Sequence, residues 1–521
     1  MNRDQSIQQL KNQESWDIFI IGGGATGLGI CLDSALRAYK TLLVEMGDFA
    51  QGTSGKSTKL VHGGVRYLRQ GNIGLVLEAL KERGLFLKNA PHLSHIQTFI
   101  IPFYSWKDFI LYSIGLRIYD LLAWNLGLGR TRNLNRKEVL NKLPEIKMDG
   151  LKGGILFYDG QFDDARMAIN LAQSSVQEGA CVLNYMELIG LEKDREGNYT
   201  RAELRDNLSQ DHYWIHAKLI INAAGVFSDS ILKLENPRAK PIIRPSQGVH
   251  LVLNERFKQS LDALMIPKTS DGRVLFMIPW HHKVVVGTTD TPVSLVELEP
   301  KPLHEEIEFI LASMGEYLLL PPERKDIESC YVGLRPLAAT DNTHSTQELS
   351  RSHKIWISEG GILYIIGGKW TTYRRMAEDC LDLAIKSGRI ENRSCRTYDY
   401  KIHGYQIGDH SDYFSIYGSD KEKLLDLVSE NPKWKEKIHP NYPFIEAEII
   451  WAIREEMAFH LRDILSRRLR WLLLDVKISL EIAPRIVDIM ALELKKNDSW
   501  KAEELKNYAD LAQSFLWENL N

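Results

Sequence analysis

The stretch Trp16-Asp-Ile-Phe-Ile-Ile21, followed directly by Gly22-Gly-Gly-Ala-Thr-Gly27, decides the fold of this chain. A run of β-prone residues leads into a G-x-G-x-x-G turn, and an apolar helical pattern follows over residues 28–39. The next strand-like run ends on Glu45, eighteen positions after Gly27, where an acid is expected to bind a ribose hydroxyl. Strand, glycine turn, helix and acid therefore predict a dinucleotide-binding βαβ unit rather than an ordinary glycine-rich turn.

The residues of this turn have separate predicted roles. Gly22 permits a tight turn, Gly24 lets the backbone approach a pyrophosphate, and Gly27 lets the helix pack closely on the strand. Ala25 and Thr26 open the helix, whose N-terminal N–H groups and partial positive charge favour phosphate. We therefore expect the turn and the first helical residues to hold the phosphates of a dinucleotide.

Composition narrows the class of protein. The chain has 521 residues, enough for two or more domains, and its 44% hydrophobic and 26% charged content is typical of a globular protein. A net charge of −3 gives no reason to expect a nucleic-acid partner. The five cysteines contain no C-x-x-C pair, which argues against a disulfide framework or a metal site and suits a reducing cytosol. We expect neither a secretory signal nor a conventional membrane-spanning helix, because the N-terminus is polar and long apolar runs are missing.

Glycine-rich turns recur far from the first. A strand-like run at residues 219–222 ends at Gly225, and another at residues 362–366 ends at Gly367 and Gly368. One phosphate fingerprint, a polar loop at residues 47–59 and these two returning elements fit one large flavin, FAD, better than NAD. The pattern predicts an α/β protein with a Rossmann-like FAD-binding domain interleaved with an antiparallel-sheet substrate domain, plus a C-terminal helical domain. The predicted boundaries are 1–390 for the oxidoreductase region (FAD-binding parts at about 1–100, 150–235 and 345–390, substrate-binding part mainly 236–344) and 391–521 for the helical domain.

Two helical segments leave alternatives open. Residues 106–124 form an aromatic-rich helical pattern, which suits either a core helix or an interfacial helix on a membrane surface. Residues 445–474 and 480–495 predict long helices, and the first contains a basic stripe at residues 462–470. Because acids interleave with these arginines, the stripe predicts a solvated or domain-facing helix, with a lipid or partner surface as the alternative.

Three cationic residues stand in unusual backbone contexts: Arg66 follows a double glycine, Arg335 lies in Gly333-Leu-Arg-Pro336, and Lys369 follows Gly367-Gly368. If the fold brings them together they can bind a phosphate or carboxylate, which arginine does bidentately.

Several motifs spread over nearly the whole chain occur in a single order. They include Thr53-Ser-Gly-Lys-Ser-Thr-Lys-Leu-Val-His-Gly-Gly-Val-Arg-Tyr67, Asp163-Asp-Ala-Arg166, Asn222-Ala-Ala-Gly225, Gln247-Gly-Val-His250, Gly287-Thr-Thr-Asp290, Gly333-Leu-Arg-Pro-Leu337 and Gly367-Gly-Lys-Trp-Thr-Thr-Tyr-Arg374. With these motifs the sequence resembles the FAD-dependent glycerol-3-phosphate dehydrogenases, within the D-amino-acid-oxidase-like flavoproteins. The resemblance implies oxidation of sn-glycerol 3-phosphate to dihydroxyacetone phosphate, with hydride transfer from C2 to FAD and electrons passed to a membrane quinone.

The resemblance also implies roles for individual residues. The substrate pocket would be lined by Arg66, Tyr67, His250, Arg335 and Lys369, of which His250, Arg335 and Lys369 are the catalytic candidates. His250 is the candidate base for the C2 hydroxyl proton, with a purely hydrogen-bonding role as the alternative. FAD would be held by Gly22, Gly24, Ala25, Thr26, Gly27, Glu45, Ser57, Lys59, Gly225, Gly368 and Thr371.

Other functions remain to be distinguished. A glycerol-3-phosphate oxidase would pass its electrons to oxygen and make hydrogen peroxide. An FAD-dependent amine or amino-acid oxidase would have little use for three phosphate-binding cations, and a flavin-binding interaction protein would need no catalytic set. Electron delivery to a quinone implies a cytoplasmic protein, peripheral on the inner face of the cell membrane. The candidates for docking are residues 106–124 and the C-terminal helices, and a homodimer is a further alternative.

Overall fold

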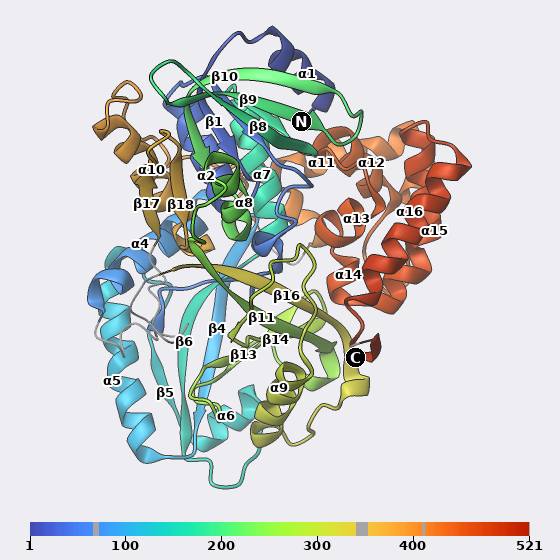
Figure 1. Cartoon of the computed structure of the whole chain (residues 1–521). Coiled ribbons are helices and arrows are strands. Elements are labelled where there is room, and N and C mark those ends of the chain that lie inside the picture. The colour runs from blue at the N-terminus through green and yellow to red at the C-terminus, as the bar shows by residue number, and fades with distance from the viewer. Residues whose placement is uncertain (66–71, 340–352, 409–411, 520–521) are drawn as a thin grey trace.

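The computed structural model describes residues 1–65, 72–339, 353–408 and 412–519, arranged as two sheet-based domains and a helical domain (Figure 1). The upper domain is built on a sheet whose strands run in the order β17-β18-β10-β1-β2-β7, extended by the hairpin β8-β9 beside β10. These strands are β1 (Trp16–Ile21), β2 (Thr41–Val44), β7 (Cys181–Leu183), β8 (Met186–Lys193), β9 (Tyr199–Asp206), β10 (His212–Asn222), β17 (Lys354–Ile357) and β18 (Leu363–Ile366).

The fingerprint strand β1 lies in the middle of this sheet. It pairs in parallel with both β2 and β10, so the ends of β1 and β10 lie at the same edge. Helices α2 (Ala25–Leu36), α7 (Asp164–Gln177) and α10 (Tyr373–Lys386) pack on one face. Apolar residues of the β8-β9-β10 meander cover the other face, which buries β1 on both sides, as expected of a parallel sheet. The predicted βαβ unit is confirmed.

The second sheet has ten strands in the order β15-β11-β14-β13-β12-β4-β6-β3, with β16 beside β11 and β5 beside β6. Its strands are β3 (Leu60–Val61), β4 (Ser94–Phe103), β5 (Arg132–Leu134), β6 (Gly153–Phe162), β11 (Ile243–Asn254), β12 (Ala263–Ile266), β13 (Leu275–Trp280), β14 (Lys283–Gly287), β15 (Thr291–Pro292) and β16 (Ile327–Ala338). The antiparallel sheet predicted for residues 236–344 is therefore present, but it also takes in β3, β4 and β6. The predicted boundaries place those three strands with the FAD-binding parts. The structure differs because a local sequence pattern indicates a strand but not the strand with which it pairs.

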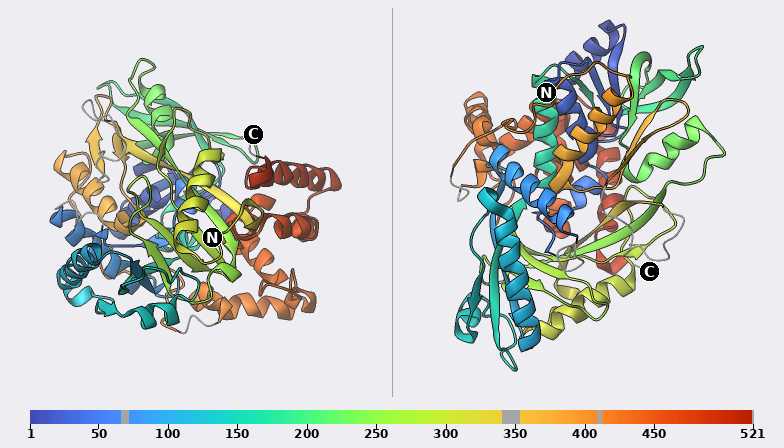
Figure 2. Two further views of the ribbon diagram at one scale, coloured as in Figure 1. Left: turned by 90° about the horizontal axis from the view of Figure 1, so that it is seen from below. Right: turned by 90° about the vertical axis from the view of Figure 1, so that its left-hand side faces the viewer.

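Four helices flank this second sheet: α4 (Ile73–Asn89), α5 (Trp106–Ala123), α6 (Arg136–Lys142) and α9 (His304–Tyr317). Figure 1 shows α5 along the outer edge of the molecule, and in the second view of Figure 2 this side faces the viewer. Its buried residues are Ser113, Leu116, Tyr119 and Ala123, and much of its remaining apolar surface is exposed. In the described part of the chain, no helix has the length and apolar character needed to cross a bilayer.

The C-terminal domain is helical, as predicted, and lies to one side of both sheets (Figures 1 and 2). It contains α11 (Lys421–Glu430), α12 (Glu446–Glu456), α13 (Leu461–Asp463), a π-helical turn (Ile464–Arg468), α14 (Trp471–Leu474), α15 (Val476–Glu493) and α16 (Asp498–Gln513). The prediction of one long helix over residues 445–474 is wrong. Met457 and Arg470 adopt left-handed conformations, with φ of 54° and 61°, and break the run.

Candidate active site

A cavity of about 750 Å³ is lined by residues of both sheets. Its wall includes the glycine turn after β1, the loop after β2, the end of β10, and residues of β11 and β16. The sequence-predicted residues that line it are Gly22, Gly24, Ala25, Thr26, Glu45, Ser57, Gly225, His250, Arg335, Gly368, Lys369 and Thr371. Arg66 and Tyr67 lie outside the described residues.

The glycine turn after β1 approaches its neighbours closely because its glycines have no side chains. Gly22 has φ +114°, and a Cβ placed on it would lie 2.6 Å from the Ala223 carbonyl oxygen. A Cβ on Gly27 would lie 1.9 Å from the Gly22 oxygen, so the helix could not approach the strand with any side chain there. Gly27 therefore acts behind the wall, as the predicted packing role requires, while Gly22 and Gly24 face the cavity. The Ser54 hydroxyl accepts a hydrogen bond from Ala25 N at 2.9 Å and fixes the start of α2.

Glu45 closes the nucleotide end of the cavity. Its carboxylate accepts hydrogen bonds from Gly23 N at 2.7 Å and from Gly47 N at 2.9 Å. Burial raises the pKa of Glu45, although both backbone N–H groups oppose the shift. Each carboxylate oxygen retains acceptor capacity, so Glu45 can receive ribose hydroxyls while it fixes the two loops around it.

Ser57 and Lys59 both point to Asp164, at the start of α7. The Ser57 hydroxyl donates to Asp164 Oδ2 at 2.7 Å, and Lys59 Nζ donates to the same oxygen at 2.6 Å. Ser57 lines the cavity, but Lys59 does not, and its side chain is only 1% exposed. The prediction that Lys59 contacts FAD therefore needs correction: its ammonium braces the loop from behind, because a buried cation needs a carboxylate partner.

His250 is the buried imidazole of the site. Its Nε2 lies 2.8 Å from Thr58 Oγ1, and its ring stacks on Tyr331 with centroids 4.8 Å apart. Burial lowers the pKa of His250 well below its ordinary 6.5, and the positive charges of Lys59 and Arg335 add to this effect. The ring is therefore neutral at pH 7. Its Nδ1 is buried and has no hydrogen-bond partner among the described residues.

Arg335 faces the cavity from β16. One guanidinium nitrogen donates to Asp290 Oδ1 at 3.1 Å, and the other donates to the Thr289 carbonyl at 2.9 Å. Asp290 therefore offsets part of the positive charge that was predicted to bind an anion. Lys369 reaches the same cavity from the turn after β18, so the two cations are brought together by strands that are adjacent neither in sequence nor in one sheet.

Sequence reasoning missed several residues of the site. Thr58, Asp164 and Asp290 hold His250, Ser57 and Arg335, respectively. Asp163, the neighbour of Asp164, accepts the capping hydrogen bond from Arg166 N at the start of α7. The cavity also has an apolar part, with Leu60, Phe99, Phe157, Met265 and Phe276 in its wall. The sequence offered no signal for this part, because its residues come from five different strands.

Comparison with known proteins gives matches over most of the chain. Residues 17–374 match the family described as FAD dependent oxidoreductase, and residues 362–503 match the C-terminal domain of alpha-glycerophosphate oxidase. A mitochondrial glycerol-3-phosphate dehydrogenase of Arabidopsis thaliana is 36% identical over 543 residues, covering 96% of this chain and 86% of that protein. The mitochondrial enzyme of Mus musculus is 37% identical over 540 residues, covering 97% of this chain and 74% of that protein.

Two solved structures are also similar. The glycerol-3-phosphate dehydrogenase from Bacillus halodurans, complexed with FAD, has a TM-score of 0.80 and 28% identity, covering 99% of this chain and 97% of that one. The L-alpha-glycerophosphate oxidase from Mycoplasma pneumoniae has a TM-score of 0.57 and 16% identity, covering 71% and 95%. The second likeness concerns the fold alone.

Proposed function

Because this chain belongs to the FAD-dependent oxidoreductases and, among them, to the glycerol-3-phosphate dehydrogenases, we propose that it oxidises sn-glycerol 3-phosphate to dihydroxyacetone phosphate. The observation that carries the proposal is one cavity in which the glycine turn is joined by His250, Arg335 and Lys369. A phosphate-bearing alcohol needs both a cationic subsite and a proton acceptor, and these side chains supply them.

The cavity fits FAD. A Cβ at Gly22 would meet the Ala223 oxygen at 2.6 Å, so only glycine fits against this backbone. Gly22 and Gly24 both lie in the cavity wall, where the missing side chains would let a pyrophosphate approach the backbone. The N-terminus of α2 opens beside it, and Glu45 and Gly225 close the nucleotide end. When bound, FAD would accept the hydride from C2 of the substrate.

The side chains around the substrate suggest a division of labour. Arg335 and Lys369 would hold the phosphate and polarise the C2 oxygen. His250 would take the C2 hydroxyl proton, since it lines the cavity and burial keeps its imidazole in the neutral form that can accept a proton. Thr58 and the Tyr331 ring fix the plane of the imidazole.

We propose a membrane quinone as the electron acceptor. The apolar part of the cavity, with Phe99, Phe157 and Met265 in its wall, belongs to a cluster that continues to Leu116 of α5. The hydroxyl of Tyr119, also on α5, donates at 2.8 Å to Asp159, another residue of the cavity wall. A hydrophobic ring that approached beside α5 would therefore meet an apolar route toward the cofactor.

We further propose that the protein works as a peripheral protein on the inner face of the cell membrane and that α5 is the docking surface. Its exposed stripe consists of Trp106, Ile110, Leu111, Ile114, Ile118, Leu121 and the adjoining Trp124. Residues 106–152 contain nine lysines and arginines against five acids, which suits anionic headgroups. If the purified protein does not bind anionic vesicles at low salt, this assignment is overturned.

The visible spectrum of the purified protein, held anaerobic, tests the reaction. Addition of sn-glycerol 3-phosphate should bleach the flavin, whereas glycerol and amino acids should leave it oxidised. Arg335→Ala should still bind FAD but need at least tenfold more substrate for half-maximal bleaching, because a charge-assisted contact is lost. A flavin that glycerol 3-phosphate leaves unchanged would refute the substrate, and rapid reoxidation with peroxide after air is admitted would favour the oxidase alternative.

A further inference from the structure

The basic stripe of the C-terminal domain is buried against the walls of the cofactor cavity. Arg467, Arg468 and Arg470 lie at or just after the π-helical turn Ile464–Arg468, and all three are buried. We propose that these arginines are positioning residues for FAD, because they hold two loops of the cavity from behind. The inference depends on FAD binding and not on the substrate proposed above.

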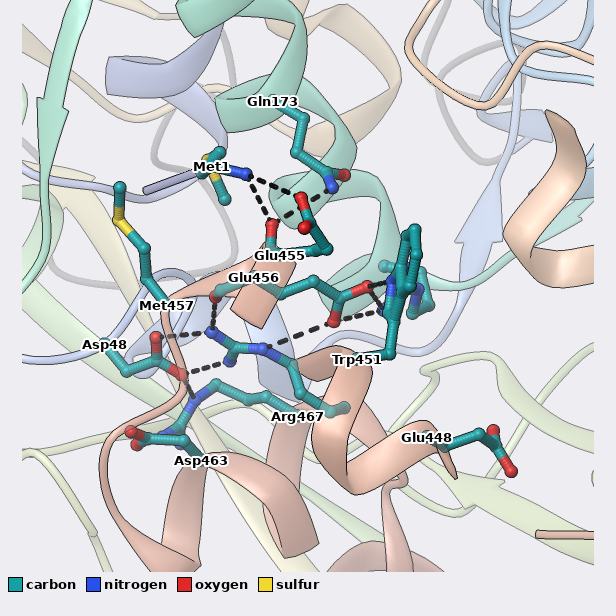
Figure 3. Close-up of polar contacts among 12 residues, drawn as sticks. Met1, Asp48, Gln173, Glu448, Trp451, Glu455, Glu456, Met457, Asp463 and Arg467 are labelled. Atoms are coloured by element: carbon teal, nitrogen blue, oxygen red, sulfur yellow. Dashed lines mark hydrogen bonds and ion pairs between the residues drawn. The ribbon is translucent and has the colours of Figure 1, made fainter. Parts of the chain in front are cut away.

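The first contact is with Asp48, in the loop that follows β2 (Figure 3). Arg468 binds this carboxylate with two nitrogens, Nη2 donating to Oδ1 at 3.0 Å and Nη1 to Oδ2. Arg467 Nε donates to the same Oδ2. Asp48 is fully buried, while its neighbours Glu45, Met46 and residues 50–54 line the cavity. The carboxylate is thus the point from which the loop around the nucleotide end is held.

The two arginines are themselves fixed within the C-terminal domain. Arg467, drawn with Asp463 in Figure 3, donates from Nη2 to Asp463 Oδ1 at 2.6 Å. Arg468 Nη2 donates to the Glu456 carbonyl at 2.6 Å. Each guanidinium therefore bridges the helical domain and the cofactor loop. A π-helical turn is rare, and such turns often occur at functional sites. Here it turns two consecutive arginines toward one carboxylate.

The second contact reaches the loop at residues 57–59. Arg470 Nε lies 2.7 Å from Asp163 Oδ2, and Asp163 caps α7. The next residue, Asp164, holds Ser57 and Lys59. One short segment of the C-terminal domain therefore supports the nucleotide loop directly and the loop beside His250 through two adjacent aspartates.

Attachment of the C-terminal domain does not by itself explain this network. An apolar cluster already joins the domain to the second sheet, with Val252, Trp280, Val285 and Tyr331 packed among C-terminal helical residues such as Trp471. Buried ion pairs contribute less net stability than apolar packing of similar volume, but they fix geometry. The arginines therefore fix the positions of the loops. When their contacts are lost, the affinity for FAD should fall before the stability of the apoprotein does.

Arg468→Lys tests the proposal, since it keeps the charge but loses the two-nitrogen contact with Asp48. The dissociation constant for FAD, measured by fluorescence titration of the apoprotein, should rise at least tenfold. The thermal midpoint of the apoprotein should change little, because the apolar interface remains. Arg454→Lys is the matched control: Arg454 pairs with Glu430 and Glu493 inside the C-terminal domain, and its FAD affinity should equal that of the wild type.

An unchanged FAD affinity in Arg468→Lys would overturn the proposal, as would an equal weakening in Arg454→Lys. If Arg468→Lys does not fold, Arg467→Gln serves in its place, because the Arg468–Asp48 pair then remains. That variant should measurably raise the dissociation constant for FAD while the thermal midpoint of the apoprotein changes little. A lowered midpoint with an unchanged dissociation constant would assign the arginine a purely structural role.

Discussion

Two segments of this chain carry the features of a membrane-binding surface, and the fold treats them in opposite ways. The arginine-rich segment at residues 462–470 is turned inward, where Arg467 and Arg468 meet Asp48. The aromatic helix α5 is turned outward, with Leu121 and Trp124 exposed by 72% and 83%. A prediction by residue type alone would have reversed these positions, because charge is normally exposed and apolar area is normally buried.

The difference lies in the available partners. Buried guanidiniums are tolerated when carboxylates meet them with good geometry. Asp48 and Asp163 are supplied by distant parts of the chain, and Asp463 by the segment itself. Helix α5 buries one narrow face against the second sheet, and the described residues provide no cover for its outer stripe. An exposed apolar patch of this size indicates an interaction surface. Partner availability, not side-chain class, decides which segment faces outward.

Removal of Asp48 should give the largest effect. Asp48→Ala leaves Arg467 and Arg468 buried without their shared counter-charge, and this should lower the free energy of unfolding by about 3–5 kcal/mol. Urea denaturation monitored by circular dichroism measures the change. Asp399→Ala, which removes the exposed pair with Lys88, is the control and should show no change. Equal effects in both variants would mean that the buried network is no more important than a surface pair.

Charge placed on the outer stripe of α5 should have the next largest effect. Ile114→Glu combined with Leu121→Glu should weaken binding to anionic vesicles at least tenfold, since two apolar contacts are lost and two negative charges face the headgroups. Sedimentation with vesicles measures the bound fraction.

Leu492→Glu is the control, because Leu492 is more exposed than Ile114 and Leu121 but lies on α15 of the C-terminal domain. It should bind vesicles like the wild type. Equal loss in both proteins would point to a nonspecific charge effect, and no loss in the α5 variant would remove this helix as the docking surface.

Low pH should reduce the contribution of the buried Asp48 carboxylate to the free energy of unfolding. Burial raises the pKa of Asp48, but Arg468 and Arg467 outweigh it and hold this pKa well below 3.8. A carboxyl with a depressed pKa stabilises the fold fully above its unfolded value and loses this contribution as the pH falls through lower values. The difference in unfolding free energy between wild type and Asp48→Asn should therefore be constant above pH 5 and shrink below pH 3.8. A constant difference down to pH 3 would contradict the assigned pKa shift.

The part of the fold that sequence could predict is the part with short-range causes. The strand, glycine turn and helix from Trp16 onward follow from adjacent residues, and the structure confirms them together with the mixed α/β class and the helical C-terminal domain. The partners of β4 and β6 could not be predicted from local pattern, because β4 pairs with β6 across 50 to 68 residues and with β12 across 164 residues. Nor could the break at Met457, whose left-handed backbone suits the network around Glu456 and has no glycine to signal it.

The candidate site also combines residues that short-range patterns predict with residues whose contacts are made by distant parts of the chain. The sequence predicts Gly22, Gly24 and Glu45 at the site from short-range pattern, and the structure places them in the cavity wall. Their role toward FAD stays a prediction. Lys59 was assigned to the cofactor, but its ammonium turns to Asp164, 105 positions away. Roles for His250, Arg335 and Lys369 stay predictions, although the cavity brings them together.

The smallest effect should come from a neutral change on the outer stripe. Leu121→Gln keeps the helix propensity and removes only exposed apolar area, so the free energy of unfolding in water should stay within about 0.5 kcal/mol of the wild type. Leu116→Ala on the inner face of the same helix should cost about 2–5 kcal/mol, because Leu116 is fully buried. A loss above about 1 kcal/mol in Leu121→Gln would mean that protein covers the stripe in solution, as in a homodimer, and would move α5 from a lipid surface to a subunit interface.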